Sequence, residues 1–155
     1  MLDSAVEIMA ARPDAGDAVH LIRALDDDLR ARYPGITLHG LRPEDVRDHR
    51  LAFLVAHADG EAIGCGAVRE LEPGVGEITR MFVQPAWRRR GVARQLLAAL
   101  EAQARKLGYV ALRLETALGQ PEAICLYRSA GYVDIPPFGE YMGNAVSVCF
   151  EKRLT

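Results

Sequence analysis

One segment near the middle of the chain constrains the fold more than any other, the run VQPAWRRRGVA at residues 83–93. It lies between an apolar stretch typical of a strand, residues 78–83, and a long pattern typical of a helix. Gly91 has no Cβ, so the backbone can bend tightly there and approach a ligand closely, and Ala93 keeps the next turn slim. The first amides of a helix have no internal partner and carry the positive end of the helix dipole. A strand, a bend and a helix start in this order predict a phosphate-binding site.

The residues after this turn support a helix start at that point. Apolar residues recur on one stripe, and Gly108 stands where a C-terminal cap is expected. Arginines around the turn add positive charge that a pyrophosphate could use. By themselves such arginines are more often a solvated cluster, and it is the strand and the helix on either side that favour phosphate. The stripe consists of Val92, Leu96, Leu97, Leu100, Ala104 and Leu107. The arginines are Arg88, Arg89, Arg90 and Arg94.

The rest of the chain predicts a single domain of mixed α/β class. At 155 residues it is long enough for one domain with a real core and too short for two ordinary ones. Within the strand expected at residues 61–71, Ile63, Cys65 and Ala67 should share one face. Period-2 and helical spacings give strands at residues 6–11, 51–57, 61–71, 77–83, 110–115, 132–135 and 145–151. Helices are expected at residues 14–33, 42–46 and 121–129, besides the long one that begins after the turn.

Composition excludes several classes of function. The formal net charge of −2 implies no broad basic field, so we expect no nucleic-acid partner, and a local arginine cluster suits a small anionic cofactor. We find no membrane-spanning stretch and no pattern of a secretory leader. The three cysteines, Cys65, Cys125 and Cys149, lack metal-ligand spacing and have apolar neighbours. We therefore expect buried cysteines, no metal and a reducing cytoplasm.

Several motifs in order resemble the GCN5-related N-acetyltransferases (GNAT), most clearly over residues 50–135. Arg88, Gly91 and Ala93 match the family signature of Arg or Gln, two residues, Gly, one residue, then Gly or Ala. Residues 81–85 are similar to the strand that receives the pantetheine arm, and residues 112–116 to the strand that follows. The run QPEAICLY, residues 120–127, is similar to the segment that places a tyrosine near the thioester sulfur, although many members have Asn at the position of Gln120.

The resemblance implies a fold and a cofactor site. The fold is a mixed, mostly antiparallel sheet that is splayed between its fourth and fifth strands and flanked by helices. Acetyl-CoA would lie in that cleft, between the strand at Met81 and the strand at Leu114. The implied coenzyme A contacts are Met81, Phe82, Val83, Arg88, Arg89, Arg90, Gly91, Val92, Ala93, Arg94, Gln120 and Tyr127.

Direct acetyl transfer from sulfur to an amine makes two chemical demands. An ammonium group must lose a proton before it can attack, and the departing thiolate must be stabilised. By resemblance, Tyr127 is the candidate for the second role, and Glu77, at the start of the strand before the turn, is the candidate base. A partly buried carboxylate in a cleft can accept a proton at neutral pH. Glu115, waters held by backbone carbonyls, or the absence of a dedicated base are the alternatives.

The sequence gives fewer indications of the acetyl acceptor than of the cofactor. Candidate contacts are Tyr33, His39, Arg80, Glu115 and Tyr141, which lies in a loop next to glycine. Arg80, if it points into the cleft, could bind a carboxylate through two hydrogen bonds. This favours a small amine metabolite, such as an amino acid or another carboxylated amine. The alternatives are a protein or peptide acceptor and a non-catalytic acyl-CoA sensor. Val146, Val148 and Phe150 suit either the chain's own core or a homodimer.

Overall fold

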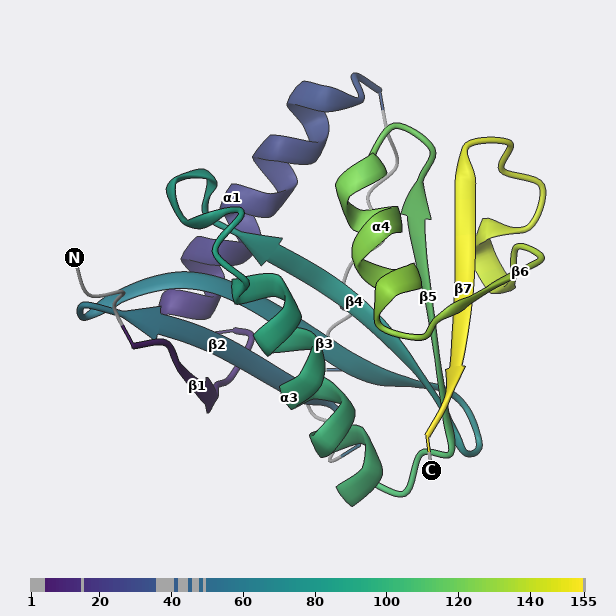
Figure 1. Ribbon diagram of the computed structural model, residues 1–155, viewed down its shortest axis with the longest axis horizontal. Coiled ribbons are helices and arrows are strands. Elements are labelled where there is room, and N and C mark those ends of the chain that lie inside the picture. The colour runs from purple at the N-terminus through teal and green to yellow at the C-terminus, as the bar shows by residue number, and fades with distance from the viewer. Residues whose placement is uncertain are drawn as a thin grey trace.

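The computed structural model describes residues 5–14, 16–35, 41, 45, 48 and 50–154. A seven-stranded sheet in the order β1-β2-β3-β4-β5-β7-β6 forms its centre (Figure 1). The strands are β1 (Glu7–Ala10), β2 (Ala52–Ala58), β3 (Glu61–Glu72), β4 (Val75–Val83), β5 (Ala111–Ala117), β6 (Val133–Ile135) and β7 (Ser147–Arg153). The helices are α1 (Gly16–Arg32), α3 (Val92–Lys106) and α4 (Pro121–Ser129), with 3-10 turns at Pro85–Trp87 and Gly139–Tyr141.

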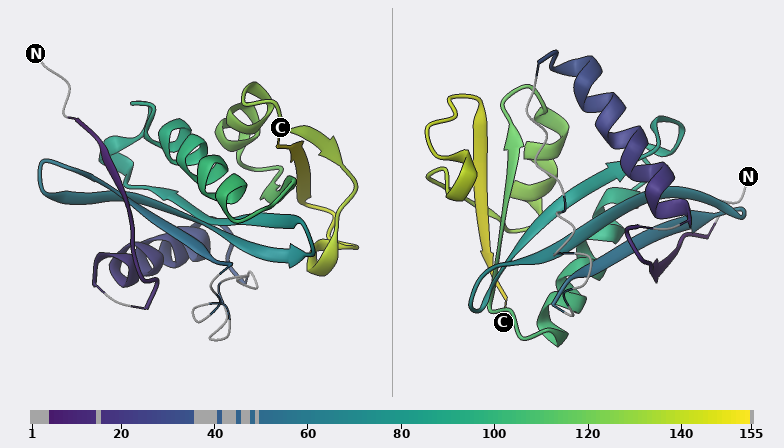
Figure 2. Two further views of the ribbon diagram at one scale, coloured as in Figure 1. Left: turned by 90° about the horizontal axis from the view of Figure 1, so that it is seen from below. Right: turned by 180° about the vertical axis from the view of Figure 1, so that it is seen from behind.

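Helices cover both faces of the sheet. Figure 2 shows α1 on one face and α3 with α4 on the other. The core is accordingly divided into two layers of buried side chains, one under α3 and α4 and a smaller one under α1. Phe150 is fully buried in the larger layer and Val148 packs against it, so both belong to the chain's own core, whereas Val146 is exposed.

The long helix follows the predicted pattern. The stripe from Val92 to Ala104 is buried in α3, with Leu107 packed at its edge. Gly108 follows the last turn with φ 89°, a conformation that favours glycine. In α1, which covers most of the helix expected at residues 14–33, the buried positions are Ala18, Leu21 and Leu25. The residues of the short helix expected at 42–46 lie, apart from Asp45, outside the described residues.

The predicted facing of β3 is wrong at one position. Ile63 packs in the layer under α3, whereas Cys65 and Ala67 pack under α1. The register of β2 against β3 shifts at this point, because Ala56 pairs with Gly64 while His57 pairs with Ala62. Ile63 is the extra residue of this β-bulge, which turns its side chain to the opposite face.

The sheet is mixed and splits between β4 and β5, as the resemblance implied. All other neighbouring strands run antiparallel, and β4 and β5 run parallel from the pair Val75–Ala111 to the pair Ile78–Leu114. Both strands are fully described and continue beyond Ile78 and Leu114 without further pairing to each other. The two halves of the sheet diverge from this point.

A bulge in β4 lies at the split. Thr79 pairs with Ala67 and Phe82 with Cys65, so Arg80 and Met81 together oppose Gly66. Arg80 has φ 57°, which is uncommon for a residue with a side chain. A Cβ at Gly66 would lie 2.6 Å from Sδ of Met81 and 2.8 Å from Cδ1 of Leu100, so a larger residue there would require these two side chains to shift. Within the described part of the chain, no helix is long and apolar enough to cross a membrane.

Candidate active site

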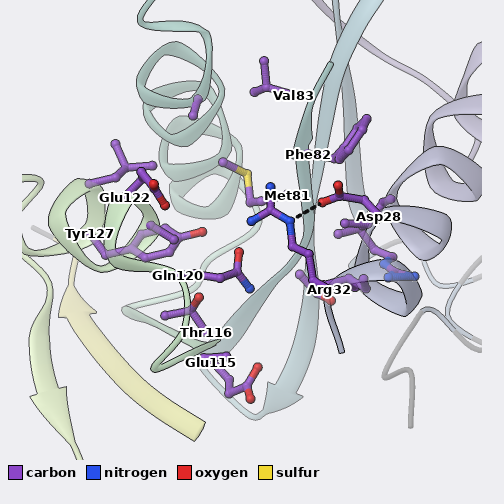
Figure 3. A pocket seen from close by; sticks show the side chains of 18 of the residues that line it. Asp28, Arg32, Met81, Phe82, Val83, Glu115, Thr116, Gln120, Glu122 and Tyr127 are labelled. Carbon is purple, nitrogen blue, oxygen red and sulfur yellow. Dashed lines mark ion pairs between the residues drawn. The ribbon is translucent and has the colours of Figure 1, made fainter. Parts of the chain in front are cut away.

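A cavity of about 1010 Å³ lies in the split between β4 and β5 (Figure 3). Its walls come from the second half of β4, the end of β5, the last turns of α1, the start of α3 and the first turns of α4. Among the described residues, five arginines and three carboxylates line it, so this part of the wall is suited to an anionic ligand. These are Arg32, Arg80, Arg88, Arg89, Arg94, Asp28, Glu115 and Glu122.

The N-terminus of α3 opens into this cavity. Gly91 is the N-cap residue with φ 80°, and no side chain caps this end. The first α-helical hydrogen bond runs from the Gln95 amide to the Gly91 carbonyl at 3.1 Å, which leaves the preceding amides to the cavity. A Cβ placed on Gly91 would meet no described atom within 4 Å, so the space beside this glycine is open. An uncapped start of a 15-residue helix facing an open cavity fits a phosphate group.

The four arginines of the turn take different positions. Arg88 donates from Nε to the Val83 carbonyl at 2.9 Å and lies over the Phe82 ring, so it helps to build the turn. Arg89, with φ 64°, is exposed at the cavity wall. Arg94 donates to Oγ of Ser129 at 2.8 Å and also lines the cavity. Arg90 stacks on Trp87, with its guanidinium carbon 4.9 Å from the ring centre, and lies outside the cavity wall.

Tyr127 reaches the cavity from the other side. It stands on α4 with only 6% of its surface exposed, and its hydroxyl points into the cavity (Figure 3). The ring packs edge-on against Tyr132, with ring centres 5.8 Å apart, and is tilted against Phe150. Burial raises the pKa of the Tyr127 phenol above its ordinary value, which keeps it neutral and able to donate a proton. Gln120, the N-cap of α4, lies beside it in the wall.

Glu77 lies in the sheet beneath the cavity and is not part of its wall. The residue is 1% exposed, and both carboxylate oxygens have partners. Oε1 accepts from Nε of Arg69 at 3.0 Å, and Oε2 accepts from the Tyr141 hydroxyl at 2.7 Å. Burial and the Glu77 charge raise the pKa of Tyr141, so that phenol is also held neutral. The structure brings Tyr141 to the cavity and leaves the Glu77 carboxylate behind it.

Glu115 is the predicted carboxylate that does line the cavity. It stands on β5 past the end of the pairing with β4, where strand residues face the split. Its Oε2 accepts a hydrogen bond from Oγ of Ser147 on the neighbouring β7 at 2.7 Å. Tyr127 and Glu115 thus meet in one cavity although they come from different elements. Among the described residues, no cluster of histidine, cysteine and carboxylate side chains is suited to a metal ion.

Arg80 lines the cavity but is already occupied. Its Nη1 and Nη2 donate to Oδ1 of Asp26 at 2.8 and 3.0 Å, and its side chain is 5% exposed. The left-handed backbone at the bulge turns this side chain toward α1, which the sequence pattern did not reveal. The predicted carboxylate-binding role of Arg80 therefore has little support in the geometry. His39 lies outside the described residues.

The last turn of α1 contributes residues that the sequence reasoning missed. Arg32 and Asp28 both line the cavity and form an i,i+4 ion pair, with Nε of Arg32 3.3 Å from Oδ2 of Asp28. That spacing was the only available signal, and it is typical of many surface pairs. Tyr33, which was predicted, also lines the cavity. A Cβ on Gly119 would lie 2.9 Å from the Tyr33 hydroxyl, so the tyrosine rests against the turn after β5.

Comparisons with known proteins agree with this geometry. Residues 18–132 match the family model described as acetyltransferase (GNAT) family. An IAA acetyltransferase of Azospirillum brasilense is 40% identical over 150 residues, covering 96% of this chain and 98% of that protein. A structure from Klebsiella pneumoniae, assigned as an acyl-CoA N-acyltransferase, superposes with a TM-score of 0.81 at 36% identity, over 97% of this chain and 98% of the other.

One solved structure also shows a ligand. N-acetylglutamate synthase from Neisseria gonorrhoeae, complexed with coenzyme A and N-acetyl-glutamate, superposes with a TM-score of 0.74 at 25% identity. The match covers 99% of this chain and 36% of that larger protein. A fold of this kind therefore accommodates coenzyme A in that relative.

Proposed function

The chain belongs to the acetyltransferase (GNAT) family and is an acyltransferase, and from this premise we propose that it transfers an acetyl group from acetyl-CoA directly to the primary amine of a small metabolite. One observation carries the proposal. The cavity through the split sheet joins the uncapped start of α3 to the Tyr127 hydroxyl. An anionic group held at the first would leave the reactive end of an extended cofactor near the second.

The residues at the phosphate end fit coenzyme A. The backbone at Gly91, Val92 and Ala93 would hold the pyrophosphate, with Arg89 and Arg94 adding charge at the rim. Met81, Phe82 and Val83 form the β4 wall along which the rest of the cofactor would lie. When bound, acetyl-CoA supplies an activated acetyl group whose sulfur must leave as a thiolate.

Tyr127 is suited to assist that departure. Its phenol is neutral, its hydroxyl faces the cavity, and burial strengthens any hydrogen bond that it donates to a developing negative charge. General-acid assistance of this kind contributes on the order of 100-fold to 10,000-fold in rate. Tyr127 is therefore the residue on which we expect the chemical step to depend most.

For the proton of the amine, the walls favour Glu115 over Glu77. Glu115 faces the cavity, and its carboxylate can attract an ammonium group and take its proton directly or through water. Glu77 is enclosed by Arg69 and Tyr141 and would act only through the Tyr141 hydroxyl. We therefore propose Glu115 as the base and Glu77 as a residue that holds Tyr141 in the wall.

Two further features bear on the setting. The Tyr33 side chain lines the cavity at the end of α1 and rests against the Gly119 turn, and a bulky aromatic wall there favours a small acceptor over an extended peptide. The three cysteines are all free, which supports the further proposal that the enzyme works in a reducing cytoplasm. Cys65 and Cys149 are buried as expected, whereas Cys125 on α4 is exposed, so the prediction of a buried cysteine is wrong there.

The test is a thiol-release assay with acetyl-CoA against amino acids, polyamines, aminoglycosides, IAA and a lysine-rich peptide, together with calorimetry of coenzyme A binding. IAA is included because it stands in the name of the Azospirillum relative. Turnover with a small amine is the expected result. Turnover confined to the lysine-rich peptide would show that the acceptor is a protein or peptide and not a small metabolite. Binding of coenzyme A without turnover of any acceptor would contradict acetyl transfer. Absence of coenzyme A binding would contradict the phosphate site at Gly91.

A further inference from the structure

We propose that Arg32 binds a carboxylate group of the acceptor, so that the preferred substrate is an amine that also carries a carboxylate. This rests on the proposed function, and it names a residue and a substrate class for the acceptor end of the same cavity. Three features of the site support this role: the end of the cavity that Arg32 occupies, the contacts that its guanidinium already makes, and the charge that faces it.

The two ends of the cavity lie on opposite faces of the sheet. The start of α3, which suits phosphate, belongs to the face that carries α3 and α4, and α1 covers the other face (Figure 2). The cavity passes between these faces because β4 and β5 are not paired beyond Ile78 and Leu114. A ligand anchored at α3 would thus leave the end beside α1 for the second substrate.

Arg32 reaches into this end from the last turn of α1. Figure 3 shows its side chain extending from the helix across the cavity toward Met81 and Gln120. Nε lies 3.3 Å from Oδ2 of Asp28, and the side chain is 40% exposed. A guanidinium has five N–H donors, and Asp28 engages it on the Nε side. Donors remain for a second carboxylate, and a planar fork of this kind holds a carboxylate through two parallel hydrogen bonds.

The other arginines of the wall are less suited to this task. Arg80 is buried and donates from both terminal nitrogens to Asp26. Arg88 is held by the Val83 carbonyl, and Arg89 and Arg94 stand at the phosphate end. Among the arginines that the structure describes, Arg32 is the one that combines exposure to the cavity with a place on the acceptor side.

The opposite wall supplies the complementary charge. Glu115 lines the cavity from β5, on the other side of the split from β4, and Figure 3 shows its carboxylate apart from the Arg32 guanidinium. An acceptor with an ammonium group toward Glu115 and a carboxylate toward Arg32 would satisfy both charges. An amine without a carboxylate would leave Arg32 paired only with Asp28.

The experiment compares matched acceptors on matched variants. The acceptors are the standard L-amino acids and their decarboxylated amines, for example L-phenylalanine with phenethylamine. The variants are Arg32→Met, which keeps an unbranched side chain without the charge, Arg32→Lys, and the control Arg30→Met. Arg30 lies on the same last turn, is 62% exposed, pairs with Asp27 at 3.8 Å and is outside the cavity wall.

Arg32→Met should lower kcat/KM for the carboxylated acceptor by about tenfold to 100-fold, mainly through KM, because one charge-assisted bidentate contact is lost. Arg32→Lys should keep part of the activity, and Arg30→Met should keep all of it. With the decarboxylated amine as acceptor, kcat/KM in Arg32→Met should stay within about twofold of wild type, because this amine has no carboxylate for Arg32 to bind. The affinity for coenzyme A should not change, because Arg32 lies at the acceptor end of the cavity.

An equal loss with both acceptors, or a wild-type enzyme that prefers the decarboxylated amine, overturns the role of Arg32 while the acetyltransferase activity stands. A wild-type enzyme that acetylates no amine at all overturns the proposed function, and this inference with it. Unchanged coenzyme A binding in Arg32→Met shows that the variant is folded.

Discussion

The two ends of the cavity are built in different ways. The phosphate end comes from one continuous stretch, residues 83–94, and relies on backbone amides and a glycine. The acceptor end is assembled from α1, β5 and the segment before β7, and relies on side chains held in ion pairs and hydrogen bonds. A site formed by backbone amides of one segment can be predicted from the local sequence. A site formed by side chains from distant segments is brought together only by the fold.

Tyr127 stands where the two ends meet, so its replacement tests whether they serve one reaction. Tyr127→Phe removes one oxygen from the cavity and keeps the packing on Tyr132 and Phe150. We expect kcat to fall by about 100-fold, with the KM for acetyl-CoA nearly unchanged, because the hydroxyl acts on the departing thiolate. Steady-state kinetics with varied acetyl-CoA measure both quantities.

The matched control is Tyr132→Phe, whose hydroxyl donates to Glu101 at 2.9 Å. This variant should lose stability and keep kcat. The pH profile gives a second check. Burial raises the pKa of Tyr127 above its ordinary value of 10, so the acid form persists upward in pH and should cause no alkaline loss of kcat below pH 10. If kcat fell at alkaline pH below pH 10 in the wild type and this fall disappeared in Tyr127→Phe, the raised pKa of Tyr127 would be contradicted.

A single added methyl group at the phosphate end should weaken coenzyme A binding. Gly91→Ala should raise the Kd for coenzyme A by about tenfold or more, because the new Cβ intrudes where phosphate approaches the amides. Calorimetry measures the affinity, and thermal unfolding measures the strain, about 1–2 kcal/mol for a non-glycine residue in this conformation.

Gly108→Ala is the control at the other end of the same helix. Gly108 has φ 89° against 80° for Gly91, and at both positions a Cβ would meet nothing within 4 Å among the described residues. Both variants should lose similar stability. Equal Kd values for coenzyme A in the two would remove the phosphate site from the start of α3.

A double-mutant cycle on Glu77 and Tyr141 tests whether Glu77 acts at the acceptor end only by holding Tyr141 in place. Glu77→Gln weakens the buried hydrogen bond from Tyr141 and also the ion pair with Arg69, and Tyr141→Phe removes the same hydrogen bond, so each should destabilise the protein by about 1–3 kcal/mol and lower kcat/KM for the acceptor several-fold. The double variant should be little worse than Glu77→Gln alone, since the same bond is lost. Urea unfolding and acceptor kinetics give the two measures. A fall in kcat of about 100-fold in Glu77→Gln alone would identify a base instead.

The smallest expected effects on coenzyme A affinity distinguish two neighbouring arginines of the turn, Arg89 and Arg90. Arg89→Ala should weaken coenzyme A binding about threefold at low salt and less at high salt, because an exposed charge is screened. Arg90→Ala should change it by less than about twofold, since Arg90 stacks on Trp87 and is not among the residues that line the cavity. Salt-dependent calorimetry on the two variants measures the difference, and an equal loss in both would place Arg90 at the ligand.

Prediction from the sequence succeeded where structure is local. The start of α3 at Gly91 and its end before Gly108 follow from spacing and glycine within a few residues, and both are confirmed. The facing of Ile63 was wrong because a bulge depends on the register between two strands, which period-2 spacing does not contain. The fold class came from the order of motifs and is confirmed by the split sheet.

The acceptor end shows the opposite case. Arg80 was a reasonable carboxylate ligand, but the left-handed backbone at the β4 bulge and Asp26 on α1 decide where its side chain goes. Arg32 and Asp28 were not singled out, because an i,i+4 pair at a helix end is usually solvated surface. Their place in the cavity depends on how α1 crosses the sheet, which no local pattern records.

We expect the short seam between β4 and β5 to act as a hinge between the two halves of the sheet. Only four residue pairs, from Val75–Ala111 to Ile78–Leu114, join its two halves in a continuous ladder. Fluctuations that widen the gap cost little there, because no ladder hydrogen bond beyond Ile78 has to break. A ligand spanning the gap would suppress this breathing, so the amides of β4 and β5 that face it should exchange with solvent more slowly when coenzyme A is bound.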